Sequence, residues 1–103
     1  MSFDEKVWKL MKRIPRGRVT TYGLIAKKLN TKAYRAVGNA CRKNPYAPRV
    51  PCHRVVRSDG RIGGFAGKTS GPTVRRKIRL LRNENVEIKN GTIVNFEKVR
   101  FRF

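Results

Sequence analysis

The fold is decided by one stretch, residues 22–43, with the sequence YGLIAKKLNTKAYRAVGNACRK. Its first apolar residues recur at helical intervals and predict a short helix that ends near Leu29. Asn30 and Thr31 interrupt this pattern and can cap a further helix, which we expect over residues 32–43. Two short helices joined by a tight turn are typical of a helix-turn-helix.

The helix expected over residues 32–43 has two different faces. Its inward stripe consists of small apolar residues, Ala33, Val37 and Ala40. Its outward face carries polar residues at i, i+4 and i+7, namely Arg35, Asn39 and Arg42. This length and polarity suit a helix that reads the major groove, although short helix pairs also occur in other small α-rich domains.

Two further helices are predicted on either side of this pair. Ser2 and Glu5 have the spacing of a capping box and begin an amphipathic helix that ends near Pro15. Ser70 and Pro72 begin the last helix, whose inward residues are Val74, Ile78 and Leu81.

Short strands complete the expected fold. Residues 55–56 and 61–62, on either side of a turn at 58–60, indicate one hairpin, and Asn90-Gly91 indicates another. Residues 99–103 alternate apolar and basic side chains, as a half-buried edge strand does. We therefore expect one domain over residues 1–103, mainly α with short β hairpins and similar to a small winged helix-turn-helix.

The charge of the chain points to a polyanionic partner. Lysine and arginine number 26 against 6 acidic residues, a net charge of +20. Nucleic acid is the first candidate for that partner. An anionic membrane is the second, but no segment pairs a broad apolar face with a basic one. We see no signal peptide and no run of about 20 apolar residues, so we expect a soluble, cytoplasmic protein.

The motif PCHRVV, residues 51–56, places the single histidine beside one of two cysteines. Most cysteines are small buried residues, and a lone histidine is usually structural. With one histidine, the two cysteines cannot close an ordinary structural zinc site, and we expect no metal. A nucleophilic Cys52 needs a base, for which His53 is the candidate, and such a histidine is usually oriented by a carboxylate. Among the acids we select Glu84, because the others lie at termini or turns.

The run RAVGNACRKNPYAPRVPCHRVV, residues 35–56, closely resembles the O(6)-alkylguanine-DNA alkyltransferases, also called methylated-DNA–protein-cysteine methyltransferases. The resemblance extends from about Phe3 to Val86. It corresponds to the C-terminal active-site and DNA-binding domain of that family, and we expect no N-terminal domain here.

The resemblance implies a role for each residue of the motif. Cys52 is expected to accept the alkyl group from O6 of guanine, in a single turnover and without a cofactor. His53 would take the thiol proton through a water, and Glu84 would hold the imidazole. Tyr22 would donate to the departing base, and Asn44 would join the recognition helix to the active-site loop.

The resemblance also implies how DNA and the flipped base are held. Arg35 is expected to fill the gap left by the flipped nucleotide. Members of the family dock this helix in the minor groove, where the small residues Ala36 and Gly38 allow a close approach beside Asn39 and Arg42. The base pocket would be formed by Val55, Gly63, Phe65 and Ala66. The expected partner is duplex DNA containing O6-alkylguanine, bound by a monomer.

Three other functions remain open. The first is an alkyltransferase-like protein that binds alkylated guanine without transfer and flags it for other repair. Proteins of that kind usually carry tryptophan where this chain has Cys52. The others are a structural nucleic-acid-binding protein, which leaves the PCHR motif unexplained, and a cysteine hydrolase. Phe65-Ala66 also departs from the tyrosine and serine of many family members.

Overall fold

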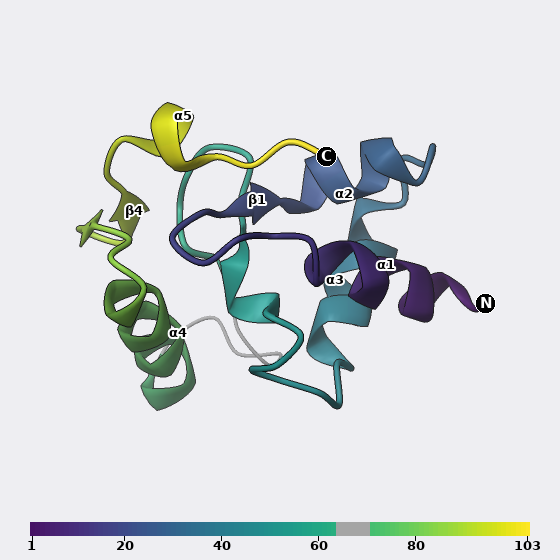
Figure 1. Ribbon diagram of the computed structural model, residues 1–103, viewed down its shortest axis with the longest axis horizontal. Coiled ribbons are helices and arrows are strands. Elements are labelled where there is room, and N and C mark those ends of the chain that lie inside the picture. The colour runs from purple at the N-terminus through teal and green to yellow at the C-terminus, as the bar shows by residue number, and fades with distance from the viewer. Residues whose placement is uncertain (64–70) are drawn as a thin grey trace.

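The computed structural model describes residues 1–63 and 71–103 and contains helices joined by very short strands (Figure 1). This confirms the expected fold class. In chain order the elements are α1 (Phe3–Met11), β1 (Thr20–Thr21), α2 (Tyr22–Lys28), α3 (Tyr34–Arg42), the 3₁₀ helix η1 (Cys52–Arg54), β2 (Val55–Val56), α4 (Pro72–Asn83), β3 (Ile88–Lys89), β4 (Thr92–Ile93) and α5 (Phe96–Val99).

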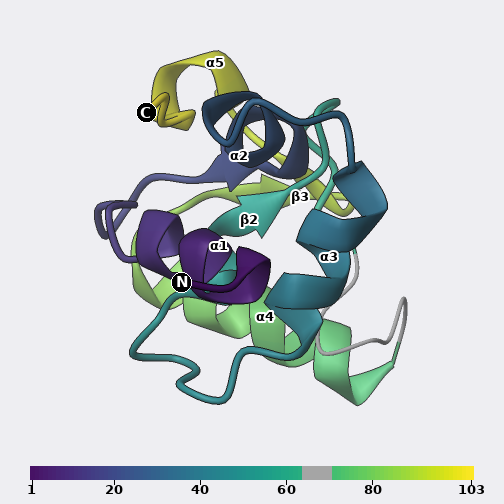
Figure 2. The same ribbon diagram turned by 90° about the vertical axis from the view of Figure 1, so that its right-hand side faces the viewer.

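The first helix begins with the capping box that the sequence predicts. The Ser2 hydroxyl accepts a hydrogen bond from the Glu5 backbone at 3.1 Å, and the Glu5 carboxylate accepts one from the Ser2 backbone at 3.1 Å. The buried face of α1 packs against α3 (Figure 2). The Trp8 indole Nε1 donates to the Ala40 carbonyl at 2.8 Å and fixes this packing.

The helix pair lies where it was predicted, but α3 is shorter at its start. Thr21 caps α2 by accepting a hydrogen bond from the Leu24 backbone at 3.0 Å. The α3 helix begins only at Tyr34, so Ala33 precedes the first turn and is exposed. The prediction of Ala33 in the inward stripe was therefore wrong. Val37 is fully buried as predicted.

The hairpin predicted from residues 55–62 was wrong about its strand pairing. The turn closes, because Gly60 donates to the Arg57 carbonyl and Arg57 donates to the Arg61 carbonyl, each at 3.0 Å. However, β2 pairs in parallel with the distant β1, and Arg61 bridges to Thr92. Both residues of β2 are fully buried, which is typical of a parallel strand covered on both faces.

In the C-terminal segment the predicted hairpin is confirmed, but the predicted edge strand was wrong. Asn90 and Gly91 connect β3 and β4 with φ of 53° and 73°, the left-handed values that a two-residue hairpin turn requires. The edge strand predicted over 99–103 is absent, because Val99 ends α5 and the residues after it make a single bridge to Val19.

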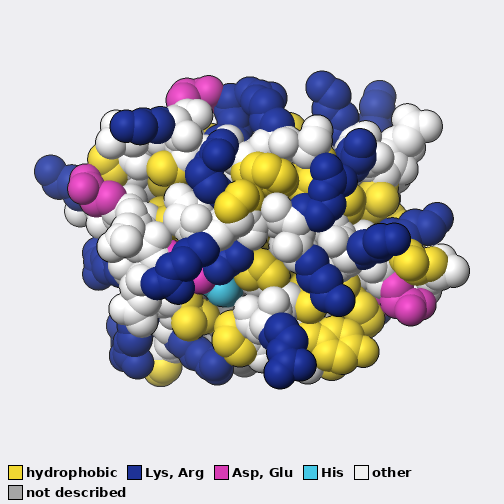
Figure 3. Space-filling view, viewed as in Figure 1, with side chains coloured by type: hydrophobic (Ala, Val, Ile, Leu, Met, Phe, Trp, Pro, Cys, Tyr) yellow, Lys and Arg dark blue, Asp and Glu magenta, His cyan; other side chains and the backbone are white. Residues whose placement is uncertain are grey.

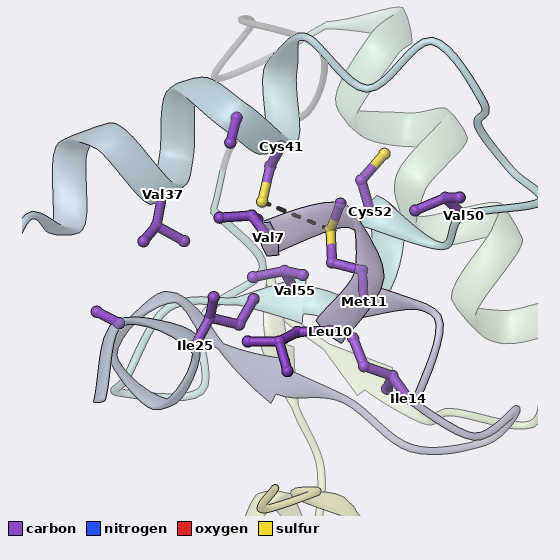
Figure 4. Packing of buried hydrophobic residues seen from close by; sticks show 12 residues of the cluster. Val7, Leu10, Met11, Ile14, Ile25, Val37, Cys41, Val50, Cys52 and Val55 are labelled. Carbon is purple, nitrogen blue, oxygen red and sulfur yellow. Dashed lines mark hydrogen bonds between the residues drawn. The ribbon is translucent and has the colours of Figure 1, made fainter. Parts of the chain in front are cut away.

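Two hydrophobic clusters fill the interior. One is built mainly on α1, α2 and α3 and includes both cysteines (Figure 4). The other lies between α4 and the C-terminal hairpin. The strand pair β1–β2 runs between the clusters, since Val55 belongs to the first and Val56 to the second. Across residues 1–63 and 71–103, no helix has the length and apolarity needed to cross a bilayer.

Candidate active site

Cys52 begins η1 directly after Pro51 and is only 9% exposed. Its sulfur points away from the other thiol, that of Cys41 (Figure 4). Burial raises the pKa of the Cys52 thiol, while the Asn44 side chain and the charge of Lys77 act in the opposite direction. At neutral pH the group is therefore a thiol and needs a base before it can react as a nucleophile.

His53 follows Cys52 and is held by a carboxylate from the distant α4. Its Nε2 atom lies 3.0 Å from Oε2 of Glu84, the C-cap residue directly after α4. The structure thus brings His53 and Glu84 into contact, as predicted. Nε2 must carry the hydrogen toward the carboxylate, so Nδ1 is left as an acceptor. Among the residues that the structure describes, Nδ1 has no hydrogen-bond partner. Burial lowers the pKa of His53, so the ring is a neutral base near pH 7.

Arg54 completes this group and was not among the residues predicted from the sequence. Its guanidinium donates to both oxygens of Glu84, at 2.8 and 2.7 Å, and to the Ile14 carbonyl at 2.7 Å. Burial alone would raise the pKa of Glu84, but hydrogen bonds from Arg54 and His53 keep it below its ordinary value. Glu84 is therefore ionised at neutral pH and fixed by two neighbours. The arginine in PCHRVV was the available signal.

Lys77 is a second missed residue. It is completely buried on α4, and its ammonium donates to the Val55 carbonyl at 2.8 Å and the Ile62 carbonyl at 2.7 Å. Burial lowers the pKa of Lys77 to about 8. The signal in the sequence was its position on the inward stripe of α4, between Val74 and Leu81, where a lysine is unusual.

Asn44 connects the end of α3 with the loop before Cys52. Its side-chain amide donates to the Val50 carbonyl at 2.8 Å, and its side-chain oxygen accepts from the Tyr46 backbone at 3.0 Å. Asn44 and Cys52 also line a pocket of about 150 Å³ together with Arg42. Two hydrogen bonds therefore join Asn44, just past the end of α3, to the loop before Cys52, and its predicted role in the site stays a prediction.

Tyr22 lies at the start of α2, near both thiols. Burial raises its pKa, and the electrostatic influence of Cys41 and Cys52 raises it further, so its hydroxyl remains protonated. With Gly63 it lines a separate pocket of about 420 Å³. Val55, predicted to line the base pocket, is buried with its carbonyl oxygen bonded to Lys77. Phe65 and Ala66, assigned to the same pocket, lie outside the described residues.

The outward face of α3 matches its prediction. Arg35, Asn39 and Arg42 are exposed, and Ala36 is half-buried. A Cβ placed on Gly38 would meet no atom within 4 Å, so the helix backbone is open to an approaching surface there. Lys and Arg side chains dominate the face of the molecule in Figure 3, where acids are few.

Cys41 occupies the core. Its sulfur lies 3.7 Å from the sulfur of Met11, and burial raises its pKa to about 12 (Figure 4). This thiol is therefore unsuited to act as a nucleophile near neutral pH.

Comparisons with known proteins agree with this geometry. A family model described as "6-O-methylguanine DNA methyltransferase, DNA binding domain" matches residues 2–86. A methylated-DNA–protein-cysteine methyltransferase of Methanosarcina mazei is 44% identical over 86 residues, which cover 82% of this chain and 52% of that protein. The chain spans about half the length of the first curated relatives it matches.

Two solved structures are also similar. One is that of Mycobacterium tuberculosis OGT in complex with DNA, with 40% identity and a TM-score of 0.72 over 82% of this chain and 50% of that one. The other is S. pombe Atl1 in complex with damaged DNA containing O6-carboxymethylguanine, with 32% identity and a TM-score of 0.80 over 100% of both chains.

Proposed function

The chain belongs to the family of 6-O-methylguanine DNA methyltransferases, and from this premise we propose that it repairs O6-alkylguanine in duplex DNA by transferring the alkyl group to Cys52. A bond forms between Sγ and the alkyl carbon while the bond from that carbon to O6 breaks. Guanine is restored, and the protein keeps a thioether. Because a thioether is a poor leaving group, each molecule acts once and needs no cofactor for this step.

His53 would remove the proton from Cys52. Nδ1 would accept it through a bridging water, since Nε2 already donates toward Glu84. The 3.0 Å contact between His53 and Glu84 is the observation that supports this proposal most directly. The carboxylate would stabilise the imidazolium that forms, and the two hydrogen bonds from Arg54 would keep it in place.

Tyr22 and Asn44 would assist the transfer. The departing guanine carries negative charge, and the protonated hydroxyl of Tyr22 can donate to it. Asn44 would hold the loop that sets the position of Cys52. The base itself would lie against the backbone near Val55 and Gly63, with Phe65 and Ala66 as further predicted contacts.

DNA would be bound on the outward face of α3. The O6 substituent cannot be reached for in-line attack inside the duplex, so the nucleotide must be flipped out. Arg35 would fill the gap, and Arg42 and Asn39 would contact the strands. The open surface around Ala36 and Gly38 supports a close approach to the minor groove.

We further propose that this stretch corresponds to the C-terminal domain of its longer relatives and acts as an intracellular monomer. A second function also deserves a test, which is binding of alkylated guanine without transfer. The full-length similarity to S. pombe Atl1 favours it, whereas a cysteine at position 52 with a paired histidine favours transfer.

A transfer assay separates the two functions. The protein is mixed with duplex DNA carrying one O6-methylguanine, and its intact mass is measured. We expect a gain of one methyl group per chain, unchanged in Cys41→Ala and absent in Cys52→Ala. Tight binding of the lesion with no change in mass would instead support the binding function and refute transfer.

A further inference from the structure

A second basic and aromatic surface lies between α1 and the loop that follows α3. It is a hollow of about 600 Å³, which we call the α1 groove and define by Trp8, Lys9, Lys12, Tyr46, Arg49 and Val50. Figure 2 shows this loop running from the end of α3 past α1. The outward residues of α3 do not line the α1 groove, so it is separate from the DNA-binding face proposed above.

Two aromatic rings in the α1 groove are held in fixed positions. Trp8 is anchored by its hydrogen bond to the Ala40 carbonyl. The Tyr46 ring meets it edge to face, with centroids 5.9 Å apart and planes at 84°. Tyr46 is nevertheless 55% exposed, which is high for a large aromatic side chain. Trp8 itself is half-buried, so the exposed ring of Tyr46 offers most of the stacking area, at little entropic cost.

Cations stand on both walls of the α1 groove. Lys9 lies on α1 and Lys12 directly follows it, while Arg49 lies on the opposite loop. The single acid in the lining, Glu5, is already bonded to Ser2 in the capping box. In Figure 3, hydrophobic side chains lie among Lys and Arg side chains on the lower right of the molecule, near the position of α1 in the same view in Figure 1.

We propose that the α1 groove binds a single strand of nucleic acid. Cations on two walls match a phosphate backbone, and the rings of Trp8 and Tyr46 match unpaired bases. A duplex cannot use those rings, because its base faces are already stacked. An acidic peptide would match the cations but would not require exposed ring faces. This binding is independent of alkyl transfer by Cys52.

The only tryptophan of the chain lies in the α1 groove, so its fluorescence reports binding there. We would titrate the full chain with short single-stranded oligothymidine. We expect quenching of Trp8, a loss of affinity of about tenfold in Tyr46→Ala, and a similar loss in the pair Lys9→Glu with Lys12→Glu. Duplex binding and the yield of methyl transfer are measured in the same variants, so failure of either proposal is seen separately.

A second pair, Lys89→Glu with Lys98→Glu, changes the net charge equally outside the α1 groove and serves as the control. It should lose much less affinity for the single strand than the groove pair. Three results would overturn the proposal: no quenching of Trp8, equal losses in both pairs, or stronger quenching by an oligoglutamate peptide that contains tyrosine.

Discussion

The ammonium group of Lys77 lies 2.8 Å from the carbonyl oxygen of Val55, on the short strand that follows η1. The same ammonium group also donates a hydrogen bond to the Ile62 carbonyl. Lys77 therefore joins α4 to β2 and to the segment around Ile62. Its charge also lowers the pKa of Cys52 against the effect of burial. Lys77 thus contributes to the architecture of the site and to its electrostatics.

Lys77→Met should weaken both contributions. Methionine keeps an apolar stem but leaves the two buried carbonyls without this donor, which we expect to cost about 1–3 kcal/mol in the free energy of unfolding. Without the nearby charge, the pKa of Cys52 rises further. Urea unfolding measures the first effect, and the rate of alkylation by iodoacetamide in a Cys41→Ala background measures the second. Unchanged alkylation near pH 8 would argue against the electrostatic role.

Glu84→Gln should destabilise the protein and slow the transfer. The substitution leaves the guanidinium of Arg54, only 16% exposed, without its charge partner, at a cost of about 3 kcal/mol. Glu97→Gln is the matched control, because Arg100 is about as buried as Arg54, at 17% exposed, but its partner Glu97 is 77% exposed. Loss of a pair whose carboxylate is in solvent should cost less than about 1 kcal/mol. Chemical denaturation compares the two variants, and equal costs would contradict the structural role of Glu84.

His53 should make both stability and transfer depend on pH. Burial lowers its pKa below the ordinary 6.5, so the unfolded chain binds this proton more readily than the folded one. The contribution of His53 to the free energy of unfolding is therefore complete above about pH 6.5 and falls as the pH drops below it. Transfer should slow in the same direction, because the neutral ring is the base.

His53→Gln tests this pH dependence. The variant should lack the loss of stability that begins below pH 6.5, while the loss caused by protonation of Glu84, below the ordinary 4.5, remains. Thermal melts across a pH series measure the difference. Parallel curves for the variant and the parent protein would show that His53 does not titrate as described.

Two substitutions at Gly38 should separate an effect on the stability of α3 from an effect on DNA binding. Gly38→Ala adds a methyl group to open space and should stabilise α3 by about 0.5–1 kcal/mol. Gly38→Leu extends a longer side chain from the same open position and should hold DNA away from the helix, lowering duplex affinity by about tenfold. Fluorescence anisotropy with a labelled duplex measures this, and Gly38→Ala serves as the size control. Equal affinities would place the contact elsewhere on α3.

Local signals in the sequence predicted much of the fold. The capping box of Ser2 and Glu5, the buried stripe of α3 at Val37, and the hairpin at Asn90 each depend on residues that are close in the chain. Such features follow from periodicity and turn preferences. The pairing of His53 with Glu84 was also expected, because few acids were available to choose from.

Contacts between residues far apart in the sequence could not be predicted in the same way. Thr20 and Val55 are both suited to strands, but nothing local shows that they pair with each other in parallel. The buried positions of Lys77 and Arg54 depend on which carbonyl groups the folded chain places near them. In a very basic sequence, a lysine or arginine is ordinarily expected to be exposed.

The position of Asn44 has a mechanical consequence for the protein after the proposed transfer. It lies just past the end of α3, the helix whose outer face is proposed to meet DNA, and its side chain is hydrogen-bonded to Val50 and Tyr46 in the loop before Cys52. Because Cys52 and Asn44 line the same small pocket, a group added to the sulfur would push against the residue that links this loop to the end of α3. Under the proposed function, a spent molecule would loosen its hold on the strand it has repaired and distinguish itself from a fresh one by shape.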